Sequence, residues 1–309
     1  MKNKKTKELK VKIWINSFRL FTLPMSAAGI VMGTLLAASD GMFSVSVFIF
    51  SLLTTACLHL LCNVANDYGD AIRNNDVGER FGKVYVRYVQ DGLLSFEEVK
   101  RMILYLTIAS CIFGALMIFF AFGFAINLPH IIFFSLGAFA IFGAIAYTNG
   151  KKPYGYRALG DLSVFIFFGV ITVAGSFILQ TGSFELSILL PATALGMPIV
   201  ALLNNNNIRD LDTDPKAGKI TIAYKLGLKG ARIYQFLLLS LTFILSSIYV
   251  AINYSGIFQW LFLFSLMPFA KYAIGFYKSK TEIEYRMQEN LIPLCVLIFS
   301  ILYGVGFCI

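Results

Sequence analysis

Two short polar stretches interrupt a sequence that is otherwise mostly apolar, and each directly follows a long apolar run. Their amide and carboxylate side chains supply oxygen ligands, which favour binding of Mg²⁺ over binding of a transition metal. Helical spacing of three or four residues would place the members of each set on one face. The ligand candidates are Asn66, Asp67, Asp70 and Asp76 in the first stretch, and Asp210 and Asp214 in the second.

Basic residues are interleaved with these acids. An uncompensated Asp deep in a bilayer costs roughly 2.5–3.5 kcal/mol, so the carboxylates require cations close by. Arg and Lys can also pair with phosphate oxygens beside a metal, and the combination indicates a diphosphate pocket. Because the pocket opens among apolar segments, the group attached to the diphosphate is expected to be a lipid. The basic candidates are Arg73, Arg80, Lys83, Arg87, Arg209, Lys216 and Lys219.

The alternative is that both stretches are ordinary solvated loops. A lone pair of acids on a loop would favour that interpretation. Two acidic sets, each immediately after an apolar run and each rich in Asn and Arg, favour a site. Asp212 would face away from Asp210 and Asp214 on a helix, so we expect it to be solvated.

Composition identifies the class of protein. The chain is 58% hydrophobic and only 14% charged, with a mean hydropathy of +0.73, which is typical of an all-α polytopic membrane protein. Apolar segments recur along all 309 residues, so we expect one integral domain over 1–309, with a basic segment at 1–12. The five cysteines and two histidines show no metal-binding spacing and give no support to redox or transition-metal chemistry.

About nine membrane-spanning helices in one bundle are predicted from the apolar runs. A signal peptide at the N-terminus is disfavoured because the first apolar run is longer than the apolar region of such a peptide and contains Arg19 and Pro24. The expected spans are 13–38, 43–65, 96–122, 129–147, 159–180, 186–203, 231–252, 257–277 and 288–308.

Charge distribution predicts the orientation. All 26 Lys and Arg fall in the N-terminal segment or in and beside alternate connections, whereas the other connections, near Asp40, Asn127, Ser183 and Asn253, carry none. By the positive-inside rule the N-terminus and both polar stretches face the cytoplasm. The net charge of +9 is therefore a topology signal. It does not indicate a nucleic-acid partner, and no obligatory protein partner is evident.

The two polar stretches resemble the two Asp-rich motifs of the UbiA superfamily of intramembrane prenyltransferases. The matching residues are Asn66-Asp67-Tyr68-Gly69-Asp70 with Asp76, and Asn206-Asn207-Ile208-Arg209-Asp210 with Asp214, Gly218, Lys219 and Thr221. Nine helices with both motifs on the cytoplasmic side also fit that superfamily, so the resemblance covers the whole chain. It implies a multi-pass enzyme of the bacterial cytoplasmic (inner) membrane, with an active site opening to the cytoplasm.

A third stretch, 153–169, is similar to one branch of the superfamily, the 1,4-dihydroxy-2-naphthoate polyprenyltransferases of menaquinone biosynthesis. The branch implies Mg²⁺-dependent transfer of a polyprenyl group from its diphosphate to the naphthoate ring, with loss of the ring carboxylate, giving demethylmenaquinone. The segment 80–90 departs from the branch, because it lacks the usual Gly-Pro-x-Arg.

The resemblance also implies roles for individual residues. The six ligand candidates would hold Mg²⁺, with Asp67, Asp70, Asp210 and Asp214 as the catalytic carboxylates. Arg87, Arg209 and Lys219 would neutralise the departing diphosphate, and Lys152 or Arg157 would attract the anionic acceptor. The aromatic rings near 147–156 would either stabilise an allylic cation or anchor the protein at the membrane interface. The full set of implied substrate-binding residues is Asn66, Lys83, Arg87, Arg209, Lys219, Tyr147, Tyr154, Arg157 and Asp161, with Tyr156 as a further member of the aromatic wall.

Two other functions remain open. One is prenyl transfer to another aromatic acceptor, such as a hydroxybenzoate, homogentisate, a porphyrin or a chlorin. The other is ion-coupled secondary transport, which would favour acids near the bilayer midplane and broken helices, whereas these acids cluster at one face.

Overall fold

The computed structural model of the protein describes residues 2–73, 88–89 and 91–309. Within these ranges nine helices are long and apolar enough to cross a membrane. The β-type pairing in the same ranges is limited to an isolated bridge between Arg157 and Ile220. The predicted class, an all-α polytopic membrane protein with about nine spans, is confirmed.

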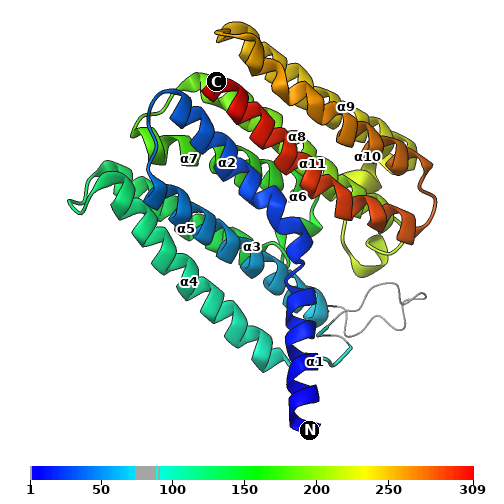
Figure 1. Ribbon diagram of the computed structural model, residues 1–309. Coiled ribbons are helices and arrows are strands. Elements are labelled where there is room, and N and C mark those ends of the chain that lie inside the picture. The colour runs from blue at the N-terminus through cyan, green and yellow to red at the C-terminus, as the bar shows by residue number, and fades with distance from the viewer. Residues whose placement is uncertain (1, 74–87, 90) are drawn as a thin grey trace.

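The described part of the chain consists mainly of long helices, with several short 3-10 segments between them (Figure 1). A basic helix, α1 (Lys2–Ser17), precedes the turn η1 (Leu20–Thr22) and the apolar helix α2 (Leu23–Ser39). The following elements are α3 (Val45–Arg73), α4 (Phe96–Phe122), α5 (Leu128–Ala146), η3 (Tyr154–Tyr156), α6 (Gly160–Val164), the π-helical η4 (Phe165–Ile171), α7 (Thr172–Thr181), η5 (Leu186–Ile188), α8 (Leu189–Arg209), η6 (Pro215–Ala217), α9 (Ile222–Ile252), η7 (Ile257–Ser265), α10 (Leu266–Lys278) and α11 (Glu282–Cys308).

Buried apolar side chains form two clusters. The larger joins α2 and α7 to α8, α9, α10 and α11, with Phe262, Phe299 and Tyr303 fully buried inside it. The smaller joins α3 to α4 around Leu61 and Val99. In Figure 1, α3, α4 and α5 lie on one side of α2, while α9 and α10 lie on the other. The helices are therefore divided into two packed groups, with α2 between them.

Several predicted helix boundaries are wrong. The helix expected to end at 65 continues to Arg73, and the one expected to end at 203 continues to Arg209. Hydropathy identifies only the apolar part of a helix. In both helices the polar turns that follow the apolar part are also helical. The last helix begins at Glu282 rather than 288 because Thr281 forms a capping box with Glu284.

Two further differences have a local backbone cause. The first predicted span is interrupted by Arg19, whose φ of 50° places it in the left-handed region, and α2 then begins with Pro24 in its first turn. Helix α9 begins at Ile222 rather than 231 because Thr221 caps it, its side chain accepting a hydrogen bond from the Tyr224 amide. Gly227, at φ 65°, then kinks α9 between its first turns and its membrane span.

Helix α2 packs very closely on α7 through glycine. A Cβ added to Gly33 would lie 2.2 Å from the carbonyl oxygen of Val173 and 2.1 Å from the hydroxyl of Ser176. Both distances are far below van der Waals contact, and the carbonyl belongs to the backbone, so it cannot rotate away. The contact therefore requires glycine at this position.

We expect Gly33→Ala to lower the free energy of unfolding by about 1–3 kcal/mol, because the added methyl group forces the two helices apart. Unfolding of the purified protein in detergent, followed by circular dichroism, measures the change. Gly114→Ala is the matched control, since a Cβ there would meet only the Thr54 methyl group at 3.6 Å. Equal stability of the two variants would contradict the packing argument.

Candidate active site

A cavity of about 440 Å³ lies among the helices. On α3 its lining residues extend from Thr54 to Ala71, which is roughly 25 Å along a helix axis. Apolar side chains such as Met117, Phe133 and Ile171 line part of it. Charged and amide side chains from the two polar stretches line another part. The cavity can thus hold a ligand that has both a polar group and a long apolar portion.

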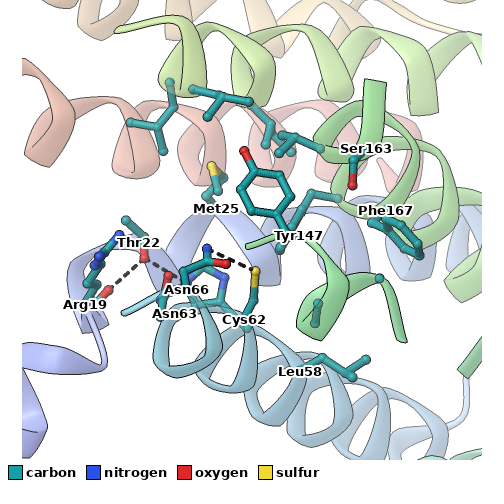
Figure 2. Close-up of a pocket in the computed structure, with 18 of the residues that line it drawn as sticks. Arg19, Thr22, Met25, Leu58, Cys62, Asn63, Asn66, Tyr147, Ser163 and Phe167 are labelled. Carbon is teal, nitrogen blue, oxygen red and sulfur yellow. Dashed lines mark hydrogen bonds between the residues drawn. The ribbon is translucent and has the colours of Figure 1, made fainter. Parts of the chain in front are cut away.

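The first polar stretch lies on the last turns of α3, and Asn66, Asp67 and Asp70 all line the cavity. The prediction that helical spacing would place them on one face is therefore confirmed for these three residues. Figure 2 shows Asn66 in the same cavity as Tyr147, with Arg19 towards one end and Phe167 towards the other.

Each of the two acids on α3 accepts a hydrogen bond from another element. The guanidinium of Arg19 donates to Asp67 over 2.5 Å. The hydroxyl of Tyr156 donates to Asp70 over 2.6 Å. Arg19 reaches Asp67 from the break between α1 and α2, where its left-handed backbone conformation costs energy that the surrounding contacts must offset.

The phenol of Tyr156 is held in its protonated form. Burial raises its pKa well above the ordinary value, and the neighbouring Asp70 carboxylate raises it further. The guanidinium of Arg73 lies over the ring, 5.3 Å from its centre. Tyr156 therefore remains a hydrogen-bond donor to Asp70 across the physiological pH range.

The second polar stretch begins in the last turns of α8, which ends at Arg209, and continues beyond the helix. Asp210 lines the cavity, and its two carboxylate oxygens accept hydrogen bonds from Arg209 Nε at 3.0 Å and Nη2 at 2.7 Å. The remaining terminal nitrogen, Nη1, donates to both oxygens of Glu289 on α11. The side chains of Arg209 at the end of α8, of Asp210 just beyond it and of Glu289 on α11 thus form one hydrogen-bonded group.

Asp214 is placed differently from Asp210. It follows in a turn beyond α8, with its amide donating to the Asp210 carbonyl over 2.9 Å, and it is not among the residues that line the cavity. Its carboxylate lies 2.9 Å from the ammonium of Lys219, which does line the cavity. Burial raises the pKa of Asp214, whereas Lys219 opposes that shift. Asp212 is exposed, as predicted.

The connection between α5 and α6 contacts both polar stretches. Thr148 donates a hydrogen bond to the Ala65 carbonyl over 3.1 Å, and a Cβ on Gly69 would come within 2.5 Å of the Thr148 hydroxyl. At its other end the Ala158 amide donates to the Ile220 carbonyl over 2.8 Å, beside Lys219. This connection therefore fixes the two stretches relative to each other.

The other predicted site residues divide into three groups. Tyr147 and Tyr154 line the cavity, and their rings meet edge to face at 5.3 Å. Arg157 is exposed, and Asp161 is buried, but neither belongs to the cavity lining. Lys152 and Lys216 are likewise exposed and outside the cavity lining. Four predicted positions lie outside the described residues: Asp76, Arg80, Lys83 and Arg87.

The described donor set fits Mg²⁺ bound together with a substrate phosphate. The cavity offers carboxylates and amide oxygens, and the buried Oδ1 of Asn206, one of its lining residues, accepts no hydrogen bond. No group of three His, Cys, Asp or Glu side chains within the described ranges is close enough to hold a metal by itself. Mg²⁺ commonly uses one or two carboxylates and completes its shell with phosphate oxygens and water.

Sequence reasoning did not identify Arg19, Arg286 or Glu289 as site residues, although all three line the cavity. A signal existed for Arg19, because a charged residue within an apolar span is a functional candidate by default. Arg286 lies in the turns of α11 that precede the predicted span of 288–308. Glu289 falls inside that span, so the same signal, a charged residue within an apolar span, existed for it. His59, in contrast, is satisfied by the Thr22 and Ser26 hydroxyls, as expected of a structural histidine.

Known proteins resemble this chain over its full length. The sequence is 38% identical to 1,4-dihydroxy-2-naphthoate octaprenyltransferase of Haemophilus influenzae, with 100% of both chains covered. It is 36% identical to the Escherichia coli K12 protein of the same name, covering 96% of this chain and 95% of that one.

Solved structures share the fold at lower sequence identity. A UbiA homologue from Archaeoglobus fulgidus bound to GPP and Mg²⁺ superposes with a TM-score of 0.63 at 15% identity, covering 94% of this chain and 99% of that one. An apo UbiA homologue from Aeropyrum pernix K1 gives 0.60 at 18% identity, covering 94% and 96%. The profile of the UbiA prenyltransferase family matches residues 26–286. The chain therefore belongs to the UbiA prenyltransferase family.

Proposed function

We propose that this protein transfers a polyprenyl group from polyprenyl diphosphate to 1,4-dihydroxy-2-naphthoate with decarboxylation, giving demethylmenaquinol, the two-electron-reduced form of demethylmenaquinone. One observation carries the proposal: both Asp-rich stretches meet in one cavity that also extends along the apolar length of α3. A prenyl diphosphate has the same two parts, an anionic head and an apolar chain. The acceptor rests on the 153–169 stretch and on the names of the relatives from Haemophilus influenzae and Escherichia coli.

The polar end of the cavity would bind the diphosphate with Mg²⁺. When bound, the metal supplies charge neutralisation for the departing diphosphate. Lys219 lines the cavity and can turn from Asp214 towards a phosphate, whereas all three nitrogens of Arg209 already donate to carboxylates. Arg209 would therefore act mainly on Asp210. The residues proposed to hold the metal are Asn66, Asp67, Asp70, Asp76, Asp210 and Asp214.

Prenyl transfer then requires an electrophilic carbon and an electron-rich ring. The allylic carbon–oxygen bond breaks, and its electron pair leaves with the diphosphate. Tyr147 and Tyr154 line the cavity, and we propose that their aromatic rings stabilise the allylic cation. The ring carbon that carries the carboxylate forms the new carbon–carbon bond, and the pair released as carbon dioxide leaves restores aromaticity. The apolar lining excludes water that would otherwise quench the cation.

The cellular setting follows from charge and hydropathy. Lys and Arg are restricted to one set of connections, which supports a cytoplasmic N-terminus and a site that opens to the cytoplasm. Large apolar side chains such as Phe142 and Ile233 are exposed on the outer faces of their helices, as contact with a lipid bilayer requires. We propose one integral domain over 1–309 in the bacterial cytoplasmic (inner) membrane.

The transport alternative has less support. The described acids that line the cavity lie at helix ends, on the last turns of α3, just beyond α8 and on the first turns of α11. Ion-coupled transporters place such groups near the bilayer midplane. Family membership likewise favours an enzyme.

Asp70→Asn and Asp210→Asn are each expected to lower prenyl transfer by at least about 100-fold, because each removes a carboxylate proposed to hold the Mg²⁺ that binds the diphosphate. The measurement is product formation in membranes that contain matched amounts of protein. Asp212→Asn is the control, since it removes a charge from the same polar stretch at an exposed position. Full activity of either cavity variant would reject the site.

Tyr156→Phe is expected to lower activity by about tenfold, because Asp70 loses a hydrogen bond to a charged group. Initial rates in detergent, with both substrates varied, measure the effect. Tyr277→Phe is the matched control, since its hydroxyl donates only to the Arg232 carbonyl, outside the cavity. A similar loss in both variants would indicate a general structural effect.

The acceptor can be tested with purified protein, Mg²⁺, a polyprenyl diphosphate and a panel of aromatic acids. We expect prenylation of the naphthoate with release of one carbon dioxide per product, counted from a carboxyl-labelled substrate. Prenylated hydroxybenzoate that keeps its carboxylate, together with no reaction of the naphthoate, would assign the protein to another acceptor. Homogentisate, porphyrin and chlorin acceptors are distinguished in the same panel.

A further inference from the structure

We infer that Glu289 is a positioning residue of the active site: acting through Arg209, it holds the carboxylate of Asp210 in place for the metal-bound diphosphate. The inference rests on the proposed function. It concerns a residue on α11, outside both Asp-rich stretches.

The first observation is that α11 presents a charged face to the cavity. Glu282, Arg286 and Glu289 all line it, at spacings of four and three residues that place them on one side of the helix. Residues in the first turns of a membrane helix have no need to be charged on their inner face. Such a pattern at a cavity points to a role there.

The second observation is the burial of Glu289. Only 5% of the residue is exposed, and both of its carboxylate oxygens accept hydrogen bonds from Arg209. A carboxylate buried to this extent is retained in a fold only with a partner, and removing one member of such a pair is costly. Glu289 and Arg209 therefore form a fixed unit.

The third observation is how Arg209 uses its planar fork. Its Nε and Nη2 bind Asp210 side by side, while its Nη1 binds Glu289. The orientation of the guanidinium is thus set from α11, and the orientation of the Asp210 carboxylate is set by the guanidinium. The backbone of Asp210 is held by its amide, which donates to the Asn206 carbonyl over 3.0 Å, so Arg209 adds the restraint on the carboxylate itself.

The charge of the group leads to the same conclusion. Two carboxylates share one guanidinium, so the three side chains carry a net charge of −1. Without the carboxylate of Glu289, Arg209 and Asp210 would form a neutral pair. A metal cation would then have to compete with Arg209 for the single carboxylate of Asp210. Glu289 therefore both orients Asp210 and leaves it able to bind a cation.

The test measures binding rather than turnover. Farnesyl S-thiolodiphosphate resists ionisation, and its binding to purified protein at increasing Mg²⁺ can be followed by equilibrium dialysis, with parallel cells that lack protein. We expect Glu289→Gln to raise the Mg²⁺ concentration for half-maximal binding by about tenfold, the effect of one nearby unit charge. Asp212→Asn, an exposed charge two residues from Asp210, is expected to change it less than about twofold.

The outcomes separate the inference from the proposed function. No Mg²⁺-dependent binding by the wild-type protein would count against the proposed function itself. Wild-type binding with an unchanged midpoint in Glu289→Gln, or an equal shift in Asp212→Asn, would overturn the role of Glu289. Thermal unfolding without Mg²⁺ identifies variants that do not fold. If Glu289→Gln does not fold, the same binding measurement is made with Glu289→Asp, whose shorter side chain withdraws from Arg209. A Mg²⁺ midpoint equal to that of the wild-type protein in Glu289→Asp would overturn the inference.

Discussion

The main physical constraint on this structure is the cost of placing carboxylates inside an apolar helical bundle. Each described acid of the two polar stretches that lies at or beside the cavity has a hydrogen-bonding or ionic partner, and two of these partners come from elements distant in the sequence. The pairs are Asp67 with Arg19, Asp70 with Tyr156, Asp214 with Lys219, and Asp210 together with Glu289 on Arg209. The site is therefore complete only when helices distant in the sequence have packed, and packing in turn depends on those pairs.

Much of the architecture was predictable because it depends on local properties. Hydropathy over about 20 residues identifies a span, and all nine predicted spans correspond to helices in the described part of the chain. Spacing on a helix likewise predicted that Asn66, Asp67 and Asp70 share a face. Helix ends were less predictable, because capping by Thr221 or Thr281 and the left-handed residue Arg19 depend on single side chains that hydropathy averages out.

The distant partners of these side chains were not predictable from the sequence. Glu289 lies 80 residues from Arg209, and Arg19 lies 48 residues from Asp67. The sequence spacing of either pair does not indicate that its members are in contact. The contacts arise only because α11 packs on α8 and the break before α2 packs on α3. Tyr156 was recognised as part of an aromatic wall, but its hydrogen bond to Asp70 depends on the fold of the connection between α5 and α6.

The pairing of charges has a consequence for how substrates enter. Both proposed substrates are anions, and a pocket rich in acids would repel them before any metal arrived. Among the described residues, five acids line the cavity beside four Arg or Lys, so the pocket is close to electroneutral. An incoming diphosphate thus meets little electrostatic barrier, and loading becomes an exchange of partners in which a base such as Lys219 leaves its carboxylate for phosphate.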